Sequence, residues 1–297
     1  MKPQLCLGTV QFGMSYGITN PAGQVPEDAV SSVLREAREA GICWLDTAHS
    51  YGNAEEVLGR QLKQSNDFRL ISKLPAQSNK SQFTFEDTEG WDQNFRASCK
   101  RLGRGGLDAL LLHAPTDLLK PGGKYLEDWL LGLRKQGLVR RLGVSIYSAQ
   151  DLEALNPDLL DLVQLPLSLL DQRLLQDGTI SRLHAMGTAI HARSVYLQGL
   201  LLTSATQWPS WVSAKQRAHQ QALESFANQR GCGLIDLALG FAQEQTKLEA
   251  VVVGVCNLEE FRDLLQAWKA RSPWQESEWQ TWAMQDTDIL DPRCWPR

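Results

Sequence analysis

The 297-residue chain lacks the patterns that would direct it to a membrane or to export. Its longest apolar stretches, such as Ala250–Val255, are far shorter than the roughly eighteen residues that a membrane helix needs. The first residues run directly into a strand-like segment, and no signal-peptide core precedes it. We therefore expect a soluble cytoplasmic protein with no membrane partner.

Runs of positive charge and paired cysteines are also missing. The 30 Lys and Arg residues are balanced by 34 Asp and Glu, which gives a net charge of −4, and no basic stretch is long enough to follow a phosphate backbone. A nucleic-acid partner is not expected. The six cysteines are scattered singly, without a C-x-x-C pair or a nearby histidine at metal-ligand spacing, so reduced thiols and no metal site are expected.

Short apolar runs alternate with amphipathic helical stretches along almost the whole chain. This alternation predicts a parallel sheet covered by helices. The runs expected as strands are 5–10, 42–45, 68–72, 107–112, 141–144, 160–163, 188–192 and 250–253. The helices expected between and after them are 26–40, 54–62, 91–102, 125–136, 149–155, 174–186, 213–245 broken at Gly231–Gly233, and 258–268.

Eight strand-and-helix units are the count of a (β/α)₈ TIM barrel. A doubly wound sheet would also alternate, but it would need a G-x-G-x-x-G turn after the first strand, and Gly8–Gly13 does not match that pattern. No change of composition marks a second domain. We therefore predict a single barrel domain over residues 1–297, in which 271–297 form a short C-terminal tail.

Polar residues stand at the carboxyl ends of the predicted strands, where barrels carry their active sites. They are Asp46, Lys73, His113, Ser145, Gln164, Arg193 and Ser194. A glycine, Gly254, stands at the end of the last predicted strand. A lysine among these groups would repel a metal cation, so metal-assisted hydrolysis fits poorly. A Schiff base on the lysine, as in aldolase-type barrels, stays open as an alternative.

A tyrosine five residues after Asp46 favours a different chemistry. Tyrosine ordinarily has a pKa of about 10, and a neighbouring ammonium group favours the phenolate. We expect Lys73 to lower the pKa of Tyr51, Asp46 to keep Lys73 charged, and His113 to bind a carbonyl oxygen. The set predicts a proton donor for the reduction of a carbonyl group.

The motifs around these residues resemble the aldo-keto reductase superfamily over residues 5–268. The segment Gly8–Gly13 is similar to the first-strand motif of the family, and Asp46–Gly59 is similar to its main signature. The pairs Ser72–Lys73 and Leu112–His113 fit the third and fourth strands. The resemblance implies that Tyr51 is the general acid, that Asp46 and Lys73 tune it, that His113 orients the substrate carbonyl, and that a nicotinamide nucleotide delivers a hydride.

The resemblance also implies a set of cofactor-binding residues, namely Thr9, Ser145, Gln164, Arg193, Ser194, Asn257 and Asp263. Two positions depart from the family pattern. Ile146 replaces the asparagine that usually contacts the carboxamide, and Arg193 replaces the aromatic residue that stacks on the nicotinamide. A cation there should disfavour the oxidised cofactor. NADPH is expected on family grounds, with NADH as the alternative, since Arg262 is the nearest base to the expected phosphate loop.

A regulatory function is the alternative to the reductase. A nicotinamide-nucleotide-sensing regulator with little turnover would use the same barrel, and Ile146 and Arg193 are the residues that favour it. Five of the ten tryptophans lie in the last thirty residues. Most of Trp274, Trp279, Trp282 and Trp295 are expected to anchor the tail against the barrel helices, and a pocket wall that includes at least one of them is the alternative. The partner is expected to be a small carbonyl substrate, bound by a monomer or a weak homo-oligomer, with a pocket formed by 14–24, 75–90, 115–123 and the tail.

Overall fold

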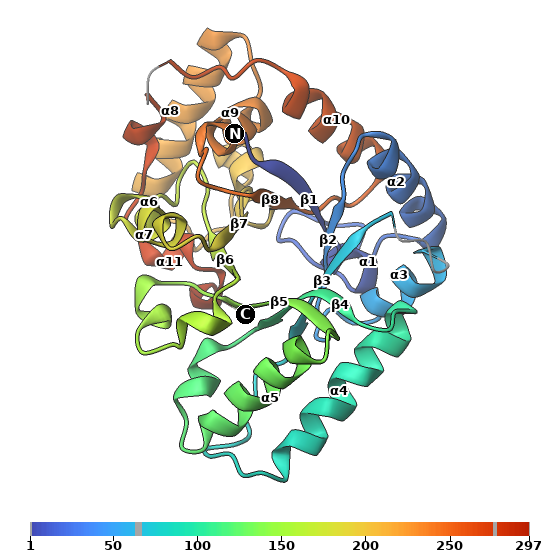
Figure 1. The fold of residues 1–297 in the computed structure, drawn as a ribbon. Coiled ribbons are helices and arrows are strands. Elements are labelled where there is room, and N and C mark those ends of the chain that lie inside the picture. The colour runs from blue at the N-terminus through green and yellow to red at the C-terminus, as the bar shows by residue number, and fades with distance from the viewer. Residues whose placement is uncertain (1, 63–66, 276–277, 297) are drawn as a thin grey trace.

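The protein folds as a closed barrel of eight parallel strands, seen in the computed structural model, which describes residues 2–62, 67–275 and 278–296 (Figure 1). The strands pair in chain order, and the last pairs with the first. They are β1 (Gln4–Gly8), β2 (Trp44–Asp46), β3 (Arg69–Leu74), β4 (Leu107–Leu112), β5 (Val139–Ser145), β6 (Leu162–Pro166), β7 (Ala189–Arg193) and β8 (Ala250–Val253). The predicted (β/α)₈ TIM barrel is confirmed.

Helices surround the barrel and cover the outer faces of the strands (Figure 1). The longer ones are α2 (Glu27–Glu39), α3 (Ala54–Leu62), α4 (Asp87–Leu102), α5 (Gly123–Lys135), α8 (Ala214–Arg230), α9 (Leu234–Glu244) and α10 (Leu258–Lys269). Shorter ones are α1 (Val10–Gly13), α6 (Arg173–Gln176), α7 (Thr179–Ala185) and α11 (Thr287–Leu290). The predicted break between α8 and α9 is confirmed at residues 231–233.

Three expected elements differ from the structure. The first strand, expected over 5–10, ends at Gly8, and Val10 begins the single turn α1. The expected helix 149–155 is a 3₁₀ turn over Ala149–Leu152 only, because the backbone is extended at Glu153 and left-handed at Ala154. A second 3₁₀ turn, Pro157–Leu159, follows it. The expected helix 174–186 is divided into α6 and α7 at residues 177–178.

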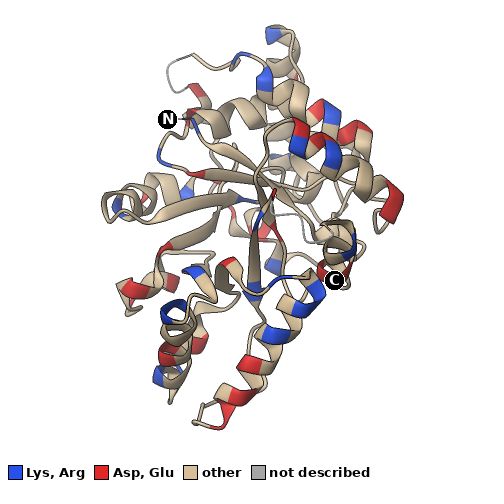
Figure 2. Cartoon of the chain, turned by 45° about the vertical axis from the view of Figure 1, so that its right-hand side comes forward, with Lys and Arg blue, Asp and Glu red and all other residues tan. Residues whose placement is uncertain are grey.

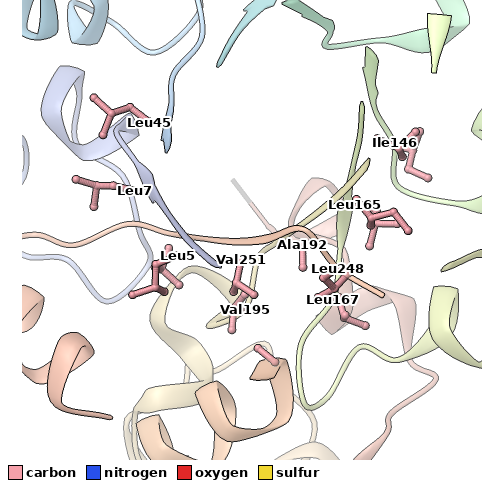
Figure 3. Close-up of a cluster of buried hydrophobic side chains, with 14 of the residues drawn as sticks. Leu5, Leu7, Leu45, Ile146, Leu165, Leu167, Ala192, Val195, Leu248 and Val251 are labelled. Carbon is pink, nitrogen blue, oxygen red and sulfur yellow. The ribbon is translucent and has the colours of Figure 1, made fainter. Parts of the chain in front are cut away.

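Alternate residues of each strand face two separate hydrophobic layers. Outward-facing side chains such as Leu7, Leu45, Leu165 and Val251 pack beneath the helices (Figure 3). Inward-facing residues form a smaller cluster that fills the barrel, composed of Cys6, Trp44, Ile71, Ala109, Leu111, Leu162 and Ala250. The two-residue period of a strand therefore determines which polar residue farther along the same strand points into the barrel.

Charged groups lie mainly outside these layers. Lys and Arg alternate with Asp and Glu along the outer helices (Figure 2). At the amino end of the barrel, Arg141 donates to both oxygens of Glu249 at 3.0 and 2.7 Å. His191 lies 3.3 Å from the same carboxylate and makes an edge contact with Trp44. Among the described residues, no helix is both long and apolar enough to cross a lipid bilayer.

The residues after α10 pack along the outside of α8 and α9. The indole of Trp274 donates to the carbonyl of Leu237 at 2.9 Å and stacks on Phe226. Farther on, Trp295 lies beside Trp211 with ring centroids 5.5 Å apart. Between Trp274 and Trp295 the segment passes through α11 and reaches the carboxyl end of the barrel at Pro292 and Arg293. Its tryptophans therefore hold the tail against the helices.

Candidate active site

The strand period places polar side chains above inward-facing apolar residues on four strands. Asp46 is two residues beyond Trp44, and Lys73 is two beyond Ile71. At the same spacing His113 follows Leu111, and Gln164 follows Leu162. On β5 the residue two before Ser145 is Gly143, where a side chain would overlap the backbone of Leu162. The carboxyl ends of parallel strands meet at one edge, so these polar groups converge.

An ion pair between β2 and β3 forms the base of the site. The ammonium group of Lys73 donates to both carboxylate oxygens of Asp46, each at 2.7 Å, and both side chains are buried. The same group donates to the carbonyl of Thr47 at 3.0 Å and lies 3.4 Å from the hydroxyl of Tyr51. The predicted grouping of Asp46, Lys73 and Tyr51 is thus present in the structure.

The electrostatics of Tyr51 differ from the sequence expectation. Burial raises the pKa of Tyr51 above its ordinary value, and the opposing effect of the nearby Lys73 does not outweigh it. Asp46 adds to the increase. Lys73 acts in the expected direction and lowers the pKa, but the net pKa is raised, because the desolvation of the phenolate could not be predicted from the sequence. Tyr51 carries its proton at neutral pH.

The same ion pair keeps Lys73 protonated, which works against its use as a nucleophile. Burial would lower the pKa of Lys73, but Asp46 and Tyr51 together raise it above its ordinary value. A Schiff-base nucleophile must lose its proton, and here the ammonium donates to a carboxylate on its buried side. These contacts argue against the aldolase alternative.

The loop that carries Tyr51 lies directly on α1. A side chain on Gly13 would overlap the carbonyl of Tyr51, and one on Gly52 would overlap the carbonyl of Gly13. Gly52 also has a left-handed backbone, with φ of 55°. The two glycines allow the backbones to approach and fix the height of Tyr51 above the barrel.

A buried polar network behind this loop was not predicted from the sequence. Glu55 of α3 is 2% exposed; it accepts from Ser72 of β3 at 2.6 Å and from Arg101 of α4 at 2.6 Å. Arg101 also lies 2.8 Å from the ring of His49. The network joins β3, α3 and α4 behind Lys73, and the only signal for it was Glu55 within the family-like segment.

His113 follows β4 and faces the phenol of Tyr51. The two rings make an edge contact with centroids 6.2 Å apart, and the Ser50 hydroxyl lies 3.3 Å from Nδ1 of the imidazole. Burial, together with the charges of Lys73 and Arg193, lowers the pKa of His113 to about 4. The imidazole is therefore neutral at pH 7, and with Nδ1 accepting from Ser50 its Nε2–H is available to a carbonyl oxygen.

These groups open into a cavity of about 850 Å³ that extends across the carboxyl end of the barrel. Of the predicted site residues, the lining contains Thr9, Asp46, Tyr51, His113, Ser145, Gln164, Arg193, Ser194 and Asp263. Lys73 lies beneath it, in contact with Asp46. Asn257 is not in the lining; it caps α10 by accepting from the amide of Glu260 at 2.8 Å.

The floor of the cavity carries an unsatisfied acceptor. Gln164 is fully buried, and its side-chain nitrogen donates to Asp46 at 2.8 Å, while its oxygen has no hydrogen-bond partner. Buried acceptors are rarely left without a donor. Ile146, by contrast, is buried in the hydrophobic layer (Figure 3). The amide N–H of a nicotinamide carboxamide could donate a hydrogen bond to the side-chain oxygen of Gln164. The apolar side chain of Ile146 offers the carboxamide no hydrogen bond.

One wall of the cavity is a stack of two guanidinium groups on a phenol, which was not predicted from the sequence. Arg193 lies 4.1 Å from the ring centroid of Tyr147, and Arg293 of the tail lies 3.5 Å from the same centroid. Arg193 also donates to the carbonyl of Ile146 at 2.9 Å. Arg293 is paired with Asp291. Tyr16, from the loop after α1, lines the same space.

The tail therefore reaches the cavity through residues other than those expected. Pro292 and Arg293 are in the lining, and Trp274, Trp279, Trp282 and Trp295 are not. The tryptophan wall is therefore absent from the described lining, and the rings of Trp274, Trp279 and Trp282 pack on α8 and α9, as the expected anchoring role requires. Of the four expected pocket segments, 14–24 and the tail contribute to the described lining, and 75–90 and 115–123 do not.

A closed barrel with an Asp, Lys, Tyr and His set at one mouth defines a class of protein, and comparison with known sequences identifies it. Residues 4–284 match the Aldo/keto reductase family. The chain belongs to this family, and the predicted membership is confirmed.

Individual relatives carry the same name. The chain is 34% identical over 128 residues to an aldo-keto reductase of Mycolicibacterium vanbaalenii, which is 42% of this chain and 43% of that protein. It is 31% identical over 194 residues to one of Mycobacterium sp. strain KMS, 62% of this chain and 64% of that protein. The chain thus spans less than two thirds of the length of either relative.

Solved structures share the fold. An aldo-keto reductase from Bacillus halodurans in its holo form matches with a TM-score of 0.72 and 21% identity, covering 93% of this chain and 90% of that one. At this identity the likeness supports the barrel architecture alone.

Proposed function

We propose that the protein is an oxidoreductase that reduces an aldehyde or ketone to the alcohol with a reduced nicotinamide nucleotide. The observation that carries the proposal is the contact of Tyr51 with Lys73 beside the neutral imidazole of His113. The unsatisfied oxygen of Gln164 on the same floor supports a carboxamide-bearing cofactor. Family membership supports the same class of reaction.

Each polar group has a separate task in this reaction. The Nε2–H of His113 and the hydroxyl of Tyr51 donate hydrogen bonds to the substrate carbonyl oxygen and place its carbon above the floor of the cavity. A bound reduced nicotinamide supplies the hydride to that carbon. Tyr51 gives its proton to the oxygen as negative charge develops there. The ammonium group of Lys73, 3.4 Å away, stabilises the phenolate that remains, and Asp46 holds Lys73 in place.

The cofactor would be bound by residues at the carboxyl ends of β1, β5, β6 and β7. Gln164 would accept from the carboxamide, and Thr9, Ser145 and Ser194 lie on the same lining. Arg193 would lie beside the ring and disfavour its oxidised, positive form. The family resemblance favours NADPH as the reductant, with NADH as the alternative. We further propose that the enzyme acts in the cytoplasm as a monomer or weak homo-oligomer on a small carbonyl substrate.

The proposal is tested with wild type and Tyr51→Phe on a panel of sugar-derived, aromatic and aliphatic carbonyls. Wild type should oxidise the reduced nucleotide when a carbonyl is present. Tyr51→Phe should lose at least about a hundredfold in kcat, since general acid catalysis contributes that much, while the nucleotide Kd stays the same. Nucleotide binding without turnover on the whole panel would favour the sensor that the Ile146 and Arg193 replacements suggest.

A further inference from the structure

We propose that the nucleotide of this pocket is NADH and that the pocket rejects the 2′-phosphate of NADPH. This inference rests on the proposed function, because it concerns the adenosine end of the same cofactor site. It departs from the NADPH preference that the resemblance implies.

The cavity has two distinct ends. At one end lie Asp46, Tyr51 and His113, where the reacting carbonyl must be bound. From there the lining continues past Gly254 at the end of β8 to α10, where it includes Leu264 and Ala267. A dinucleotide with its nicotinamide near Tyr51 extends toward α10, because barrels commonly bind phosphates at the loops after strands seven and eight. The adenosine ribose then lies near α9 and α10.

The charged side chains that line this second end are all carboxylates. They are Asp236 of α9 and Glu260 and Asp263 of α10. Glu260 is held in place, because it accepts from the amide of Cys256 at 2.7 Å and from the Asn257 side chain at 3.3 Å. Asp236 accepts from the amide of Gly233 at 2.8 Å. Both carboxylates are thus fixed near the start of their helices.

The cations that could balance a phosphate are elsewhere. Among the described lining residues, the Lys and Arg side chains are Arg193 and Arg293, and both stack on Tyr147 beyond the end of β5. Arg262, the nearest base in the sequence, pairs with Glu36 of α2 at 2.5 Å and is not in the lining. Arg262 therefore stabilises the contact between α10 and α2 on the outside of the barrel.

A ribose hydroxyl and a ribose phosphate differ sharply in such surroundings. A hydroxyl donates a hydrogen bond to a carboxylate, which is how many dinucleotide-binding proteins recognise NAD. A phosphate monoester carries about −1.5 to −2 charges at pH 7 and has acceptors only. Next to Glu260 and Asp263 it would meet like charge without a partner. The carboxylates therefore fit NADH and do not fit NADPH.

The direct experiment measures the Kd of wild-type protein for NADH and NADPH by cofactor fluorescence, without any carbonyl substrate. NADH should bind at least about tenfold more tightly, since like-charge contacts strongly disfavour a partner. Raising the salt concentration should tighten NADPH binding and leave NADH nearly unchanged, because salt screens the repulsion.

A charge-neutral variant isolates the carboxylate. Glu260→Gln keeps an oxygen acceptor for the amide of Cys256 and removes the charge. It should lower the Kd for NADPH several-fold and so reduce the difference between the Kd values for NADPH and NADH. Glu259→Gln is the matched control: Glu259 is exposed in the same helical turn, lies outside the lining and carries the same charge. It should change both Kd values by less than about twofold.

The outcomes separate the two proposals. Equal or tighter binding of NADPH by wild type overturns the NADH assignment and leaves the proposed reductase intact. An equal response of the two Gln variants also contradicts the role of Glu260. If neither nucleotide binds, both the reductase and the NADH assignment fail.

Discussion

At the scale of single residues, the ionisation of the site leads to a prediction for the pH dependence of reduction. Tyr51 has a raised pKa and stays protonated through neutral pH, and His113 has a pKa of about 4 and stays neutral. The kcat/KM for carbonyl reduction should therefore be flat from about pH 5 to 9. Its decrease should begin only above the ordinary tyrosine pKa of about 10, because the pKa of Tyr51 is raised. Inflections near pH 6.5 that disappear in His113→Gln would contradict a buried, neutral imidazole.

The residues at the strand ends could be predicted because their geometry follows from the sequence pattern. Asp46, Lys73 and His113 each close an apolar run, and parallel pairing brings such ends together. The pKa of Tyr51 could not be predicted, because it depends on how much water reaches the phenol. Arg293 was not predicted because a tail residue reaches the cavity only through the path of the chain.

At the scale of elements, long apolar runs and strongly amphipathic helices were predicted closely. The strands 107–112 and 250–253 match the structure, as does the α8 to α9 break. Short elements were less accurate, because one turn of 3₁₀ helix gives no periodic signal, as at Ala149–Leu152. The turn α1 was missed because its four residues, Val10–Gly13, are too few to show a helical period. The close approach of α1 to the Tyr51 loop could therefore not be predicted from the sequence.

That approach gives a prediction about Gly52. Gly52→Ala should destabilise the protein by about 2 to 4 kcal/mol, because the new methyl group meets the carbonyl of Gly13 and the backbone is left-handed. It should also lower kcat by displacing Tyr51. Gly41→Ala is the control, with φ of 77° and open space around the new methyl, and should cost about 1 kcal/mol. Calorimetry and kcat measure both effects; equal losses in the two variants would refute the steric argument.

At the scale of the whole molecule, the tail connects the outer helices to the cavity. We propose that residues 1–297 form a single domain in which 271–297 are this tail. The contacts of Trp274 with α8 and α9 join the tail to the barrel, so one cooperative thermal transition is expected in calorimetry. Two separate transitions would indicate that the tail unfolds independently.

The tail should also affect substrate binding more than cofactor binding. Arg293→Ala removes a guanidinium from the Tyr147 wall, far from the α10 end of the cavity. It should raise the carbonyl KM by about threefold to tenfold and change the nucleotide Kd by less than about twofold. Arg271→Ala, an exposed residue of the same tail, serves as the control and should change neither. Equal effects of Arg293→Ala on both constants would contradict this division.

The central claim is that Tyr51 is a proton donor for carbonyl reduction. The most direct measurement is single-turnover oxidation of the bound reduced nucleotide by a carbonyl substrate, compared between wild type and Tyr51→Phe at equal cofactor occupancy. The account predicts rapid oxidation in wild type and a rate at least about a hundredfold lower in the variant. Equal rates in the two proteins, or no oxidation in wild type across the carbonyl panel, would contradict it.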